Sequence, residues 1–314
     1  MSILPDLPAL GPAAVTIGVF DGVHRGHQVL LAATREAAAA RGAWPVALVF
    51  DPPPAEVLHA GHVVPRLGPL PDTLRRVRAA GVDHALAVRF DDRLRAMAPE
   101  EFLDGLRSVL DLEALVLTPD SALGRDRSGT PDRLAELGVA RGFDVVVIQP
   151  ERDEGVISST RIRAALDQGD ITTAARLLGR LPTVWGTVVA GDGRGWSLGY
   201  PTANLTFAYQ PALPALGIYL GQASAPAAGV VEQPALLSVG VRPTVTTAGP
   251  LTVEAHLLDW SGDLYGTDLE LGIGHRLRDE RRFDTLDALV RQMRRDERAA
   301  RTLLASPIAS SGGV

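Results

Sequence analysis

The chain has 314 residues, 46% of them hydrophobic, and a formal net charge of −6, and this length suits two domains better than one. It contains no cysteine, which excludes disulfides, a thiol nucleophile and thiolate metal sites. All 31 basic residues are arginine, which excludes lysine chemistry. A bound phosphate must therefore be met by backbone N–H groups, arginine, histidine or a metal ion.

Charge and hydropathy also limit the partners. Acidic and basic residues are interspersed along the chain, which argues against a general nucleic-acid binder. No apolar run is long enough to span a membrane, and the first twelve residues lack the pattern of a signal peptide. We expect a cytoplasmic protein that acts on small molecules, without a nucleic-acid or membrane partner; the sequence does not predict the oligomeric state.

The first half of the chain predicts an α/β domain. Apolar, β-branched runs are separated by alanine-, leucine- and arginine-rich segments of helical composition. The runs cover residues 13–19, 44–50, 84–88, 114–118 and 143–149. This alternation is typical of a parallel sheet covered by helices on both faces, in which ligands bind beyond the carboxyl ends of the strands.

After about residue 180 the pattern changes to short strand-like runs divided by Gly, Pro and Asp turns. These runs cover residues 181–190, 215–223, 233–241, 251–259 and 267–274. They predict a small antiparallel barrel or sandwich, closed by a helix near 284–304. We expect domains at 1–180 and 181–305, a linker near 179–182, and a disordered Ser/Gly tail at 306–314.

Two histidines stand three residues apart directly after the first predicted strand. His24 and His27, with Gly26 between them, precede a predicted helix, so both can lie at its amino-terminal end. Backbone N–H groups and the helix dipole stabilise a phosphate at such an end, and glycine allows its close approach. A zinc site would need further ligands, and no HExxH motif is present. The pair taken alone is equally compatible with a structural role.

The segment "VISSTRIRAAL" follows the last predicted strand of the same half. Ser158 or Ser159 can simply cap the next helix. The functional alternative is a second phosphate-binding helix start, with Arg161 or Arg163 facing the same nucleotide. An HxGH motif after the first strand combined with SSTxxR after the last is typical of the nucleotidylyltransferase superfamily.

The second half carries a separate constellation, "GDGRGWSLGYPTANL" followed by "TVEAHLLD". The glycines either fold around phosphates or only turn the chain. Thr202 and Asn204, two residues apart on a predicted strand, share one face and offer oxygens that suit Mg²⁺. Glu254 lies in an apolar strand, where it either faces solvent or serves as a general base.

The chain resembles the bacterial bifunctional riboflavin kinase/FMN adenylyltransferases, also called FAD synthetases, along residues 13–300. Eight segments match the family in order: "GVFDGVHRGH", "FDP", "FDDRLRAMAPEEF", "SSTRIR", "GDGRGWSLGYPTAN", "SVGVRPTV", "VEAHLLDWSGDLYG" and "LRDERRFDTLDAL". The resemblance implies a Rossmann-like adenylyltransferase domain followed by a flavokinase β-barrel. It also implies that the protein forms FMN from riboflavin and ATP, and FAD from FMN and ATP, with Mg²⁺.

The resemblance also assigns roles to individual residues. In the first module it implies catalytic roles for His24 and His27, and nucleotide binding by Gly18, Phe20, Asp21, Gly26, Ser159, Thr160 and Arg163. In the second it implies nucleotide binding by Gly191, Gly195, Thr202 and Asn204, with the last two as metal ligands and Glu254 as the catalytic base. Flavin-binding roles fall to Asp120 in the first module and Arg278 in the second.

Some positions depart from the family pattern, mostly in the first module. Pro53 replaces a histidine, and Ser121 and Leu123 replace two aromatic residues of the expected flavin pocket. Lost aromatic contacts weaken binding by about 0.5–1.5 kcal/mol each, so we expect a raised KM for FMN unless another aromatic residue such as Phe50 covers the ring. Three hypotheses follow: a two-activity enzyme, a flavokinase with a weak or inactive first module, and a non-catalytic flavin or nucleotide sensor.

Overall fold

The computed structural model describes residues 10–59, 61–191, 195, 198–241 and 251–306. By residue contacts the chain divides into two units, one comprising 1–64 and 69–158 and the other 65–68 and 159–314. The short segment 65–68 groups with the second unit because the Arg66 amide donates to the Gln210 carbonyl and its carbonyl accepts from the Ala212 amide, each at 2.8 Å. The predicted tail at 306–314 lies outside the described residues, apart from Ser306.

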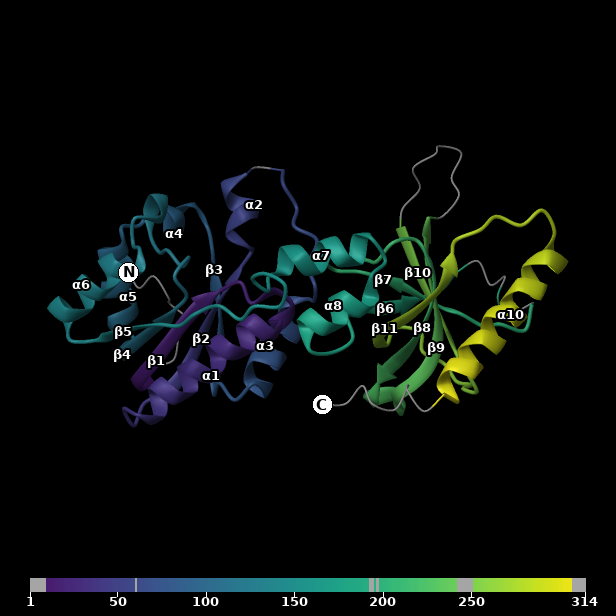
Figure 1. The fold of residues 1–314 in the computed structure, drawn as a ribbon, viewed down its shortest axis with the longest axis horizontal. Coiled ribbons are helices and arrows are strands. Elements are labelled where there is room, and N and C mark those ends of the chain that lie inside the picture. Colours follow the sequence, from purple (N-terminus) through teal and green to yellow (C-terminus); the bar gives the residue numbers. More distant parts are fainter. Residues whose placement is uncertain (1–9, 60, 192–194, 196–197, 242–250, 307–314) are drawn as a thin grey trace. The chain divides into compact units, whose positions relative to one another are not determined.

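The first unit is a five-stranded parallel sheet in the order β3-β2-β1-β4-β5 (Figure 1). Its strands are β1 Leu10–Gly18, β2 Trp44–Asp51, β3 His84–Arg89, β4 Leu110–Leu117 and β5 Asp144–Val147. The helices are α1 Arg25–Ala39, α2 Pro54–Leu58, α3 Leu70–Ala79, α4 Asp92–Ala96, α5 Pro99–Arg107 and α6 Pro131–Arg141, with short 3₁₀ turns η1 Asp21–Val23 and η2 Arg125–Arg127. The prediction of a parallel α/β domain is confirmed.

Both faces of this sheet are buried, which explains why its strands are apolar without alternation. Alternate residues of β1 belong to different cores, since Ala14 packs in one cluster and Val15 in another, each fully buried. Helices α1 and α3 cover the first face, and α5 and α6 cover the second. Strand β1 pairs with both β2 and β4, so the strand order reverses there, and a crevice at the carboxyl ends of β1 and β4 is where such sheets bind ligands.

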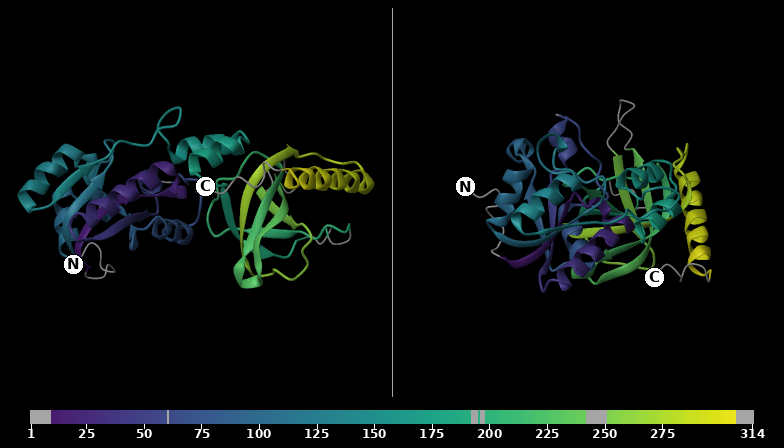
Figure 2. Two further views of the ribbon diagram at one scale, coloured as in Figure 1. Left: turned by 60° about the horizontal axis from the view of Figure 1, so that its bottom comes forward. Right: turned by 60° about the vertical axis from the view of Figure 1, so that its left-hand side comes forward.

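The second unit is a closed six-stranded barrel in the order β10-β7-β6-β11-β8-β9, and each pair of neighbouring strands is antiparallel. Its strands are β6 Thr183–Val189, β7 Ala203–Thr206, β8 Gly217–Ala225, β9 Val230–Val241, β10 Leu251–Leu257 and β11 Asp268–Asp279. Helices α7 Ser159–Asp167 and α8 Ile171–Leu178 precede it, η3 Pro226–Ala228 joins β8 to β9, and α10 Leu286–Leu304 closes the unit (Figure 2). Of the two predicted forms, the barrel is therefore the correct one.

Helices α7 and α8 group with the barrel. Leu166 and Leu177, one from each helix, are almost fully buried. The Leu166 carbonyl accepts a hydrogen bond of 2.9 Å from the Ala215 amide, in the loop before β8. The two helices therefore contribute to the packing of the second unit.

A fragment that starts at Ser159 should accordingly be more stable than one that starts at Leu181. The difference should reach at least about 2 kcal/mol, the contribution of one buried leucine side chain. Urea unfolding of both fragments, followed by circular dichroism, measures it. Equal free energies of unfolding would show that α7 and α8 add nothing to the barrel.

Candidate functional site

The loop between β1 and α1 has an unusual backbone. Phe20 and Val23 adopt positive φ angles of 53° and 41°, and Gly22 lies at 77°. Asp21 is 8% exposed and Phe20 is 1% exposed, so the packing around the loop holds it in this conformation. Non-glycine residues with such angles cost about 1–3 kcal/mol each and cluster at functional sites.

Glycine avoids tight contacts at the start of α1. A Cβ atom on Gly26 would lie 3.2 Å from the His24 ring and 3.4 Å from the Ile157 carbonyl oxygen. Gly18, the last residue of β1, is similarly close to the Phe20 ring, at 3.3 Å from where its Cβ would stand. The loop backbone can therefore approach a ligand at the carboxyl end of β1 without side chains in the way.

The two predicted histidines form one unit at the amino terminus of α1. His24 is the N-cap residue, and its Nδ1 accepts a hydrogen bond of 3.3 Å from the His27 amide. Nδ1 of His24 therefore carries no proton. The two rings stack, with centroids 3.7 Å apart and an interplanar angle of 16°.

His27 has an unsatisfied polar atom. Its Nδ1 is buried and has no hydrogen-bond partner among the described residues. Burial, and secondarily the neighbouring His24, hold the pKa of His27 well below its usual value, so the ring is neutral at pH 7. A buried nitrogen without a partner is costly unless a ligand supplies one, and the helix amino terminus favours an anion there.

The segment that precedes SSTxxR is fixed to the same helix start. Arg25 donates to Glu151 at 2.8 Å and to Asp153 at 2.9 Å, and Ile157 lies next to Gly26. The next helix, α7, begins at Ser159 in the second unit and holds the remaining predicted nucleotide-binding residues of this motif, Thr160 and Arg163, in its first turns.

A cavity of about 490 Å³ opens at the carboxyl ends of β2, β3 and β4. Its apolar wall includes Phe50 and Phe90, whose rings meet edge to face at 5.3 Å, together with Phe102 and Leu123. Charged side chains of the turn η2 stand beside this wall. An apolar wall with a polar edge suits an aromatic ring system that bears a phosphate.

The loop after β4 explains one of the family departures. The Ser121 hydroxyl accepts a hydrogen bond from the Thr118 amide at 3.1 Å, so serine holds a tight turn at a position where the resemblance implies an aromatic ring. Asp120, a predicted flavin-binding residue, is exposed and accepts from the Thr118 hydroxyl at 2.7 Å. Asp120 is not among the residues that line the cavity, whereas Leu123 lines it.

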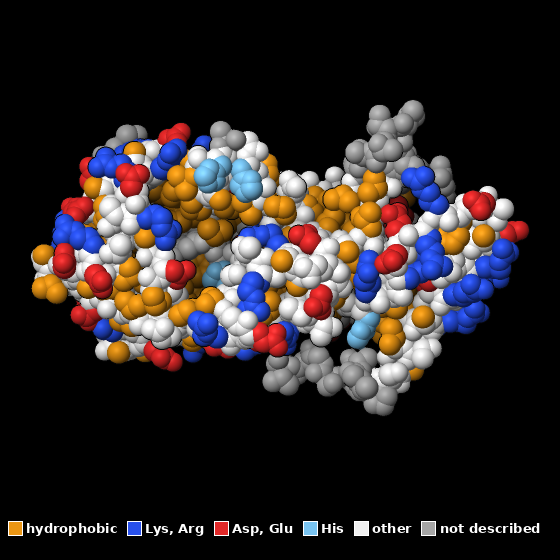
Figure 3. All heavy atoms as spheres, turned by 45° about the horizontal axis from the view of Figure 1, so that its top comes forward, with side chains coloured by type: hydrophobic (Ala, Val, Ile, Leu, Met, Phe, Trp, Pro, Cys, Tyr) orange, Lys and Arg blue, Asp and Glu red, His pale blue; other side chains and the backbone are white. Residues whose placement is uncertain are grey.

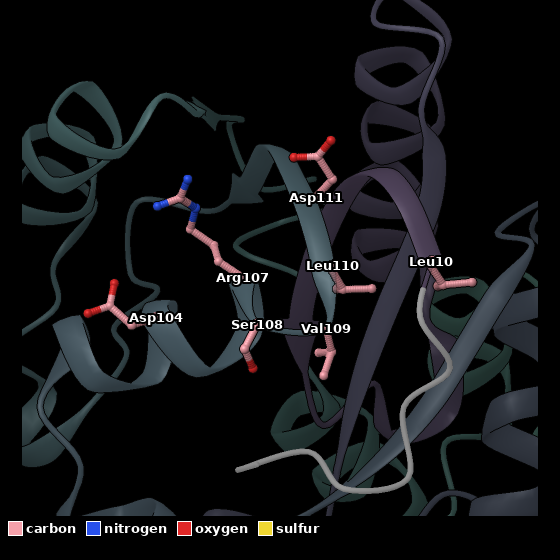
Figure 4. A pocket seen from close by; sticks show the side chains of 7 residues that line it. All are labelled: Leu10, Asp104, Arg107, Ser108, Val109, Leu110 and Asp111. Atoms are coloured by element: carbon pink, nitrogen blue, oxygen red, sulfur yellow. The ribbon is translucent and has the colours of Figure 1, made fainter. Parts of the chain in front are cut away.

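A second pocket of the first unit, of about 510 Å³, lies at the opposite edge of the sheet. Leu10 and Leu110, the first residues of β1 and β4, line it with charged residues of α5 (Figure 4). Figure 4 shows Asp104, Arg107 and Asp111 pointing in different directions rather than toward one point. Because ligands of open α/β sheets bind at the carboxyl ends of the strands, this pocket is not the nucleotide site.

In the barrel, strand register brings the predicted kinase residues together. Glu254 of β10 stands directly opposite Asn204 of β7 on one side and Ser238 of β9 on the other. Directly opposed residues point to the same face of a sheet, with Cβ atoms about 4.5–5.5 Å apart. The flanking residues Val253 and Ala255 are buried in the barrel core, so Glu254 and Asn204 lie on its outer face.

The glycine loop packs against the same residues. A Cβ atom on Gly191 would collide with the Asn204 side chain, and one on Gly195 would collide with the Tyr200 carbonyl and stand 3.3 Å from the Thr202 Oγ1. Thr202 precedes β7 rather than lying within it, so a turn and not strand alternation places its side chain. All four of these predicted residues, Gly191, Gly195, Thr202 and Asn204, line one cavity of about 480 Å³.

Arg278, the predicted flavin-binding residue of the second module, is held by α10. Its Nε donates to both carboxylate oxygens of Asp296 at 3.0 Å, and its Nη2 donates to one of them at 2.7 Å. Its guanidinium also stands 5.9 Å from the centroid of the Phe283 ring. Strand register places Arg278 opposite Ile218, which is opposite Ser238.

Several residues at these sites were not predicted from the sequence. They are Phe90 and Phe102 in the first cavity, Trp260 and Tyr265 in the second, and Asp296 on α10. The aromatic residues fall in segments that match the family, which was an available signal. Asp296 had a weaker signal, an acid in an arginine-rich helix four residues before the apolar Ala300.

Comparisons with known proteins agree with this two-site arrangement. The family model described as FAD synthetase matches residues 7–161, and the one described as riboflavin kinase matches residues 178–304. The bifunctional riboflavin kinase/FMN adenylyltransferase of Pseudomonas fluorescens is 38% identical over 92% of each chain. The protein of the same name from Escherichia coli K12 is 37% identical over 91% of each chain.

A solved structure also shares the fold. The structure of a protein named as a macrolide-efflux protein from Streptococcus pneumoniae covers 96% of this chain and 97% of its own, at a TM-score of 0.85 and 28% identity. In the part of the chain that the structure describes, no helix is long and apolar enough to cross a membrane.

Fold and sites together define a two-domain transferase with a nucleotidyltransferase module and a kinase module. The two family models and the sequence identity along nine-tenths of the chain indicate the same protein family. The chain belongs to the bifunctional riboflavin kinase/FMN adenylyltransferase family, and among the three hypotheses this supports the two-activity enzyme over a kinase with an inactive first module.

Proposed function

We propose that the first module transfers AMP from ATP to FMN. An oxygen of the FMN phosphate bonds to the α-phosphorus, the bond to the bridging oxygen breaks, and pyrophosphate leaves. The observation that supports this best is the stacked His24–His27 pair at a helix amino terminus, with an unpartnered buried Nδ1 on His27. A triphosphate supplies the missing acceptor for that nitrogen, once it carries the ring proton.

The family motifs assign further residues to ATP binding. Gly18, Phe20, Asp21 and Gly26 would border the nucleotide, and Ser159, Thr160 and Arg163 would bind its phosphates. Hydroxyls and N–H groups at a second helix start, with a guanidinium one turn further, are suited to the charge that develops on the departing pyrophosphate. Asp120, in the loop after β4, would bind the flavin.

In this proposal the isoalloxazine ring of FMN occupies the cavity with Phe50 and Phe90. Phe50→Ala should raise the KM for FMN about tenfold, because an aromatic contact of about 0.5–1.5 kcal/mol is lost together with buried area. The kcat should change less than threefold, since the contact is made in both ground and transition states. Steady-state kinetics of FAD formation measures both constants.

The matched control for this change is Trp44→Ala. Trp44 is a half-exposed aromatic residue at the other end of the same strand, β2, and its loss should leave the KM for FMN unchanged. A wild-type KM in Phe50→Ala would place the flavin elsewhere.

The second module is proposed to phosphorylate riboflavin. The ribityl 5′-hydroxyl attacks the γ-phosphorus of ATP, Glu254 accepts the hydroxyl proton, and ADP leaves. The cavity with Gly191, Gly195 and the aromatic residues Trp260 and Tyr265 would hold the nucleotide. Riboflavin would lie on the outer face of the barrel between Glu254 and Arg278.

Mg²⁺ fits the residues at this site. Thr202 and Asn204 offer a hydroxyl and an amide oxygen, the hard donors that Mg²⁺ prefers when phosphates and water supply its other ligands. No group of three or more His, Asp or Glu side chains gathers in the described part of the chain, which suits an ion that arrives with its nucleotide. When bound, Mg²⁺ would neutralise phosphate charge.

The two activities act in series, because the FMN that the second module forms is the substrate of the first. We propose functional modules at 1–180 and 181–305; by residue contacts, helices α7 and α8 group with the second unit. We also propose a cytoplasmic location, where ATP is available, and small-molecule partners alone.

The proposed function is tested by incubating pure protein with riboflavin and Mg-ATP and separating the flavins by chromatography. FMN should appear first and FAD after it. A separate reaction with added FMN isolates adenylylation. FMN without FAD, even at millimolar FMN, would leave only the kinase, and neither product would refute both activities.

A further inference from the structure

Asp296 differs from the other charged residues of its unit in its burial. It is 6% exposed, and it is the only buried charged side chain in the described residues of the second unit. Its carboxylate accepts from Arg278 through two nitrogens, and from Gln292 Nε2 at 2.8 Å. The outer face of the same helix carries exposed arginines (Figure 3).

A buried ion pair of this kind is weak evidence for a stabilising role. The cost of removing two charges from water offsets most of their attraction, and a well-packed apolar pair is often as stable. Helix α10 already has an apolar contact one turn further, where fully buried Ala300 joins Leu220 and Leu258. The ion pair therefore requires an explanation other than attachment of the helix.

The geometry of the pair restricts the Arg278 guanidinium. Of its five N–H groups, two are engaged by Asp296 and one by the Asp279 carbonyl at 2.8 Å. Within the described residues this leaves two N–H groups, one on Nη1 and one on Nη2, on a guanidinium that the other contacts hold in place. The Arg278 side chain is only 15% exposed, so it has little freedom to reorient.

Strand register relates this guanidinium to the proposed base. Arg278, Ile218, Ser238 and Glu254 stand opposite one another on four adjacent strands. Three strand spacings of about 4.8 Å put the backbone positions of Arg278 and Glu254 about 14 Å apart. A tricyclic ring with a five-carbon chain spans such a distance, so its hydroxyl end can meet Glu254 while its pyrimidine carbonyls meet the N–H groups of Arg278.

We infer that Asp296 is a positioning residue for riboflavin, acting through Arg278. It fixes the guanidinium so that the two remaining N–H groups donate to the flavin ring. The inference rests on the kinase activity proposed above.

Asp296→Asn provides the test, because it keeps the shape and removes the charge. The Kd for riboflavin without ATP, measured by flavin fluorescence, and the KM for riboflavin should rise at least about tenfold. The KM for ATP and the kcat at saturating riboflavin should stay within threefold. Asp296→Glu should recover part of the loss.

The matched control is Asp259→Asn, which removes another ion pair of α10, the exposed one with Arg301 at 2.7 Å. It should leave riboflavin binding unchanged. If Asp296→Asn does not fold, Arg278→Lys carries the test: it retains a cation for Asp296 but loses the planar fork, and the same selective rise is expected.

The results separate the two proposals. Wild-type riboflavin binding in folded Asp296→Asn or in Arg278→Lys, or equal effects on the constants for riboflavin and ATP, would overturn the positioning role alone. A wild-type protein that neither binds riboflavin nor forms FMN would refute the kinase function on which it rests.

Discussion

Glu254→Gln should reduce FMN formation from riboflavin by about 10²–10⁴-fold, the usual contribution of a general base. The amide keeps the size of the side chain and its place opposite Asn204, but it cannot accept the hydroxyl proton. The kcat for FMN formation should fall by this factor, because proton transfer takes place in the transition state. Chromatography of the flavin products measures it.

Two controls accompany this change. FAD formation from added FMN should remain at the wild-type rate, since Glu254 belongs to the other module. Glu232→Gln makes the same substitution at an exposed position of β9 and should leave both activities intact. Near-normal FMN formation in Glu254→Gln would remove this residue from the mechanism.

His27→Ala should reduce FAD formation from added FMN by about 10²–10³-fold, the loss expected when a preorganised polar group at a charged transition state is removed. FMN formation from riboflavin should be unchanged. Substitution of His27 tests the reaction more directly than substitution of His24. His24 caps α1, so its loss would also cost about 1 kcal/mol of stability. The two reactions are assayed separately with FMN or riboflavin as the substrate.

His84→Ala is the matched control for this variant. His84 begins β3 at the amino-terminal edge of the same sheet, where its ring meets Trp44 edge to face at 5.6 Å. Its loss should leave FAD formation unchanged. If His27→Ala still forms FAD at the wild-type rate, the unpartnered nitrogen does not serve the reaction.

The order of elements was predictable from local sequence. Apolar runs such as 44–50 and 114–118 became the buried parallel strands β2 and β4, because burial on both faces requires apolar residues without alternation. The change near residue 180 to short alternating runs predicted the antiparallel half. Sequence could not choose between a barrel and a sandwich, because closure depends on pairing between distant strands such as β6 and β11.

The candidate sites were predictable in part. The HxGH and PTAN motifs identified His27 and Asn204 as candidates, because the spacing within a short motif can be read directly from the sequence. The lining of the cavity with Phe50 and Phe90 was harder to predict, since Phe50, Phe90 and Leu123 come from strand β2 and from the segments after β3 and β4. The partner of Arg278 lies on a helix 18 residues further along the chain, and no local pattern connects them.

The sequence by itself determined the two-module organisation, the HxGH and PTAN motifs and the residue types at each candidate site, because these depend on local spacing and composition. Only the tertiary structure decided that Glu254 stands opposite Asn204, that His27 keeps a buried Nδ1 without a partner, and that Asp296 holds Arg278. The physical reason is that strand register, burial and ion pairing are set by contacts between residues far apart in the chain, and one step of register would move Glu254 to the opposite face of its strand.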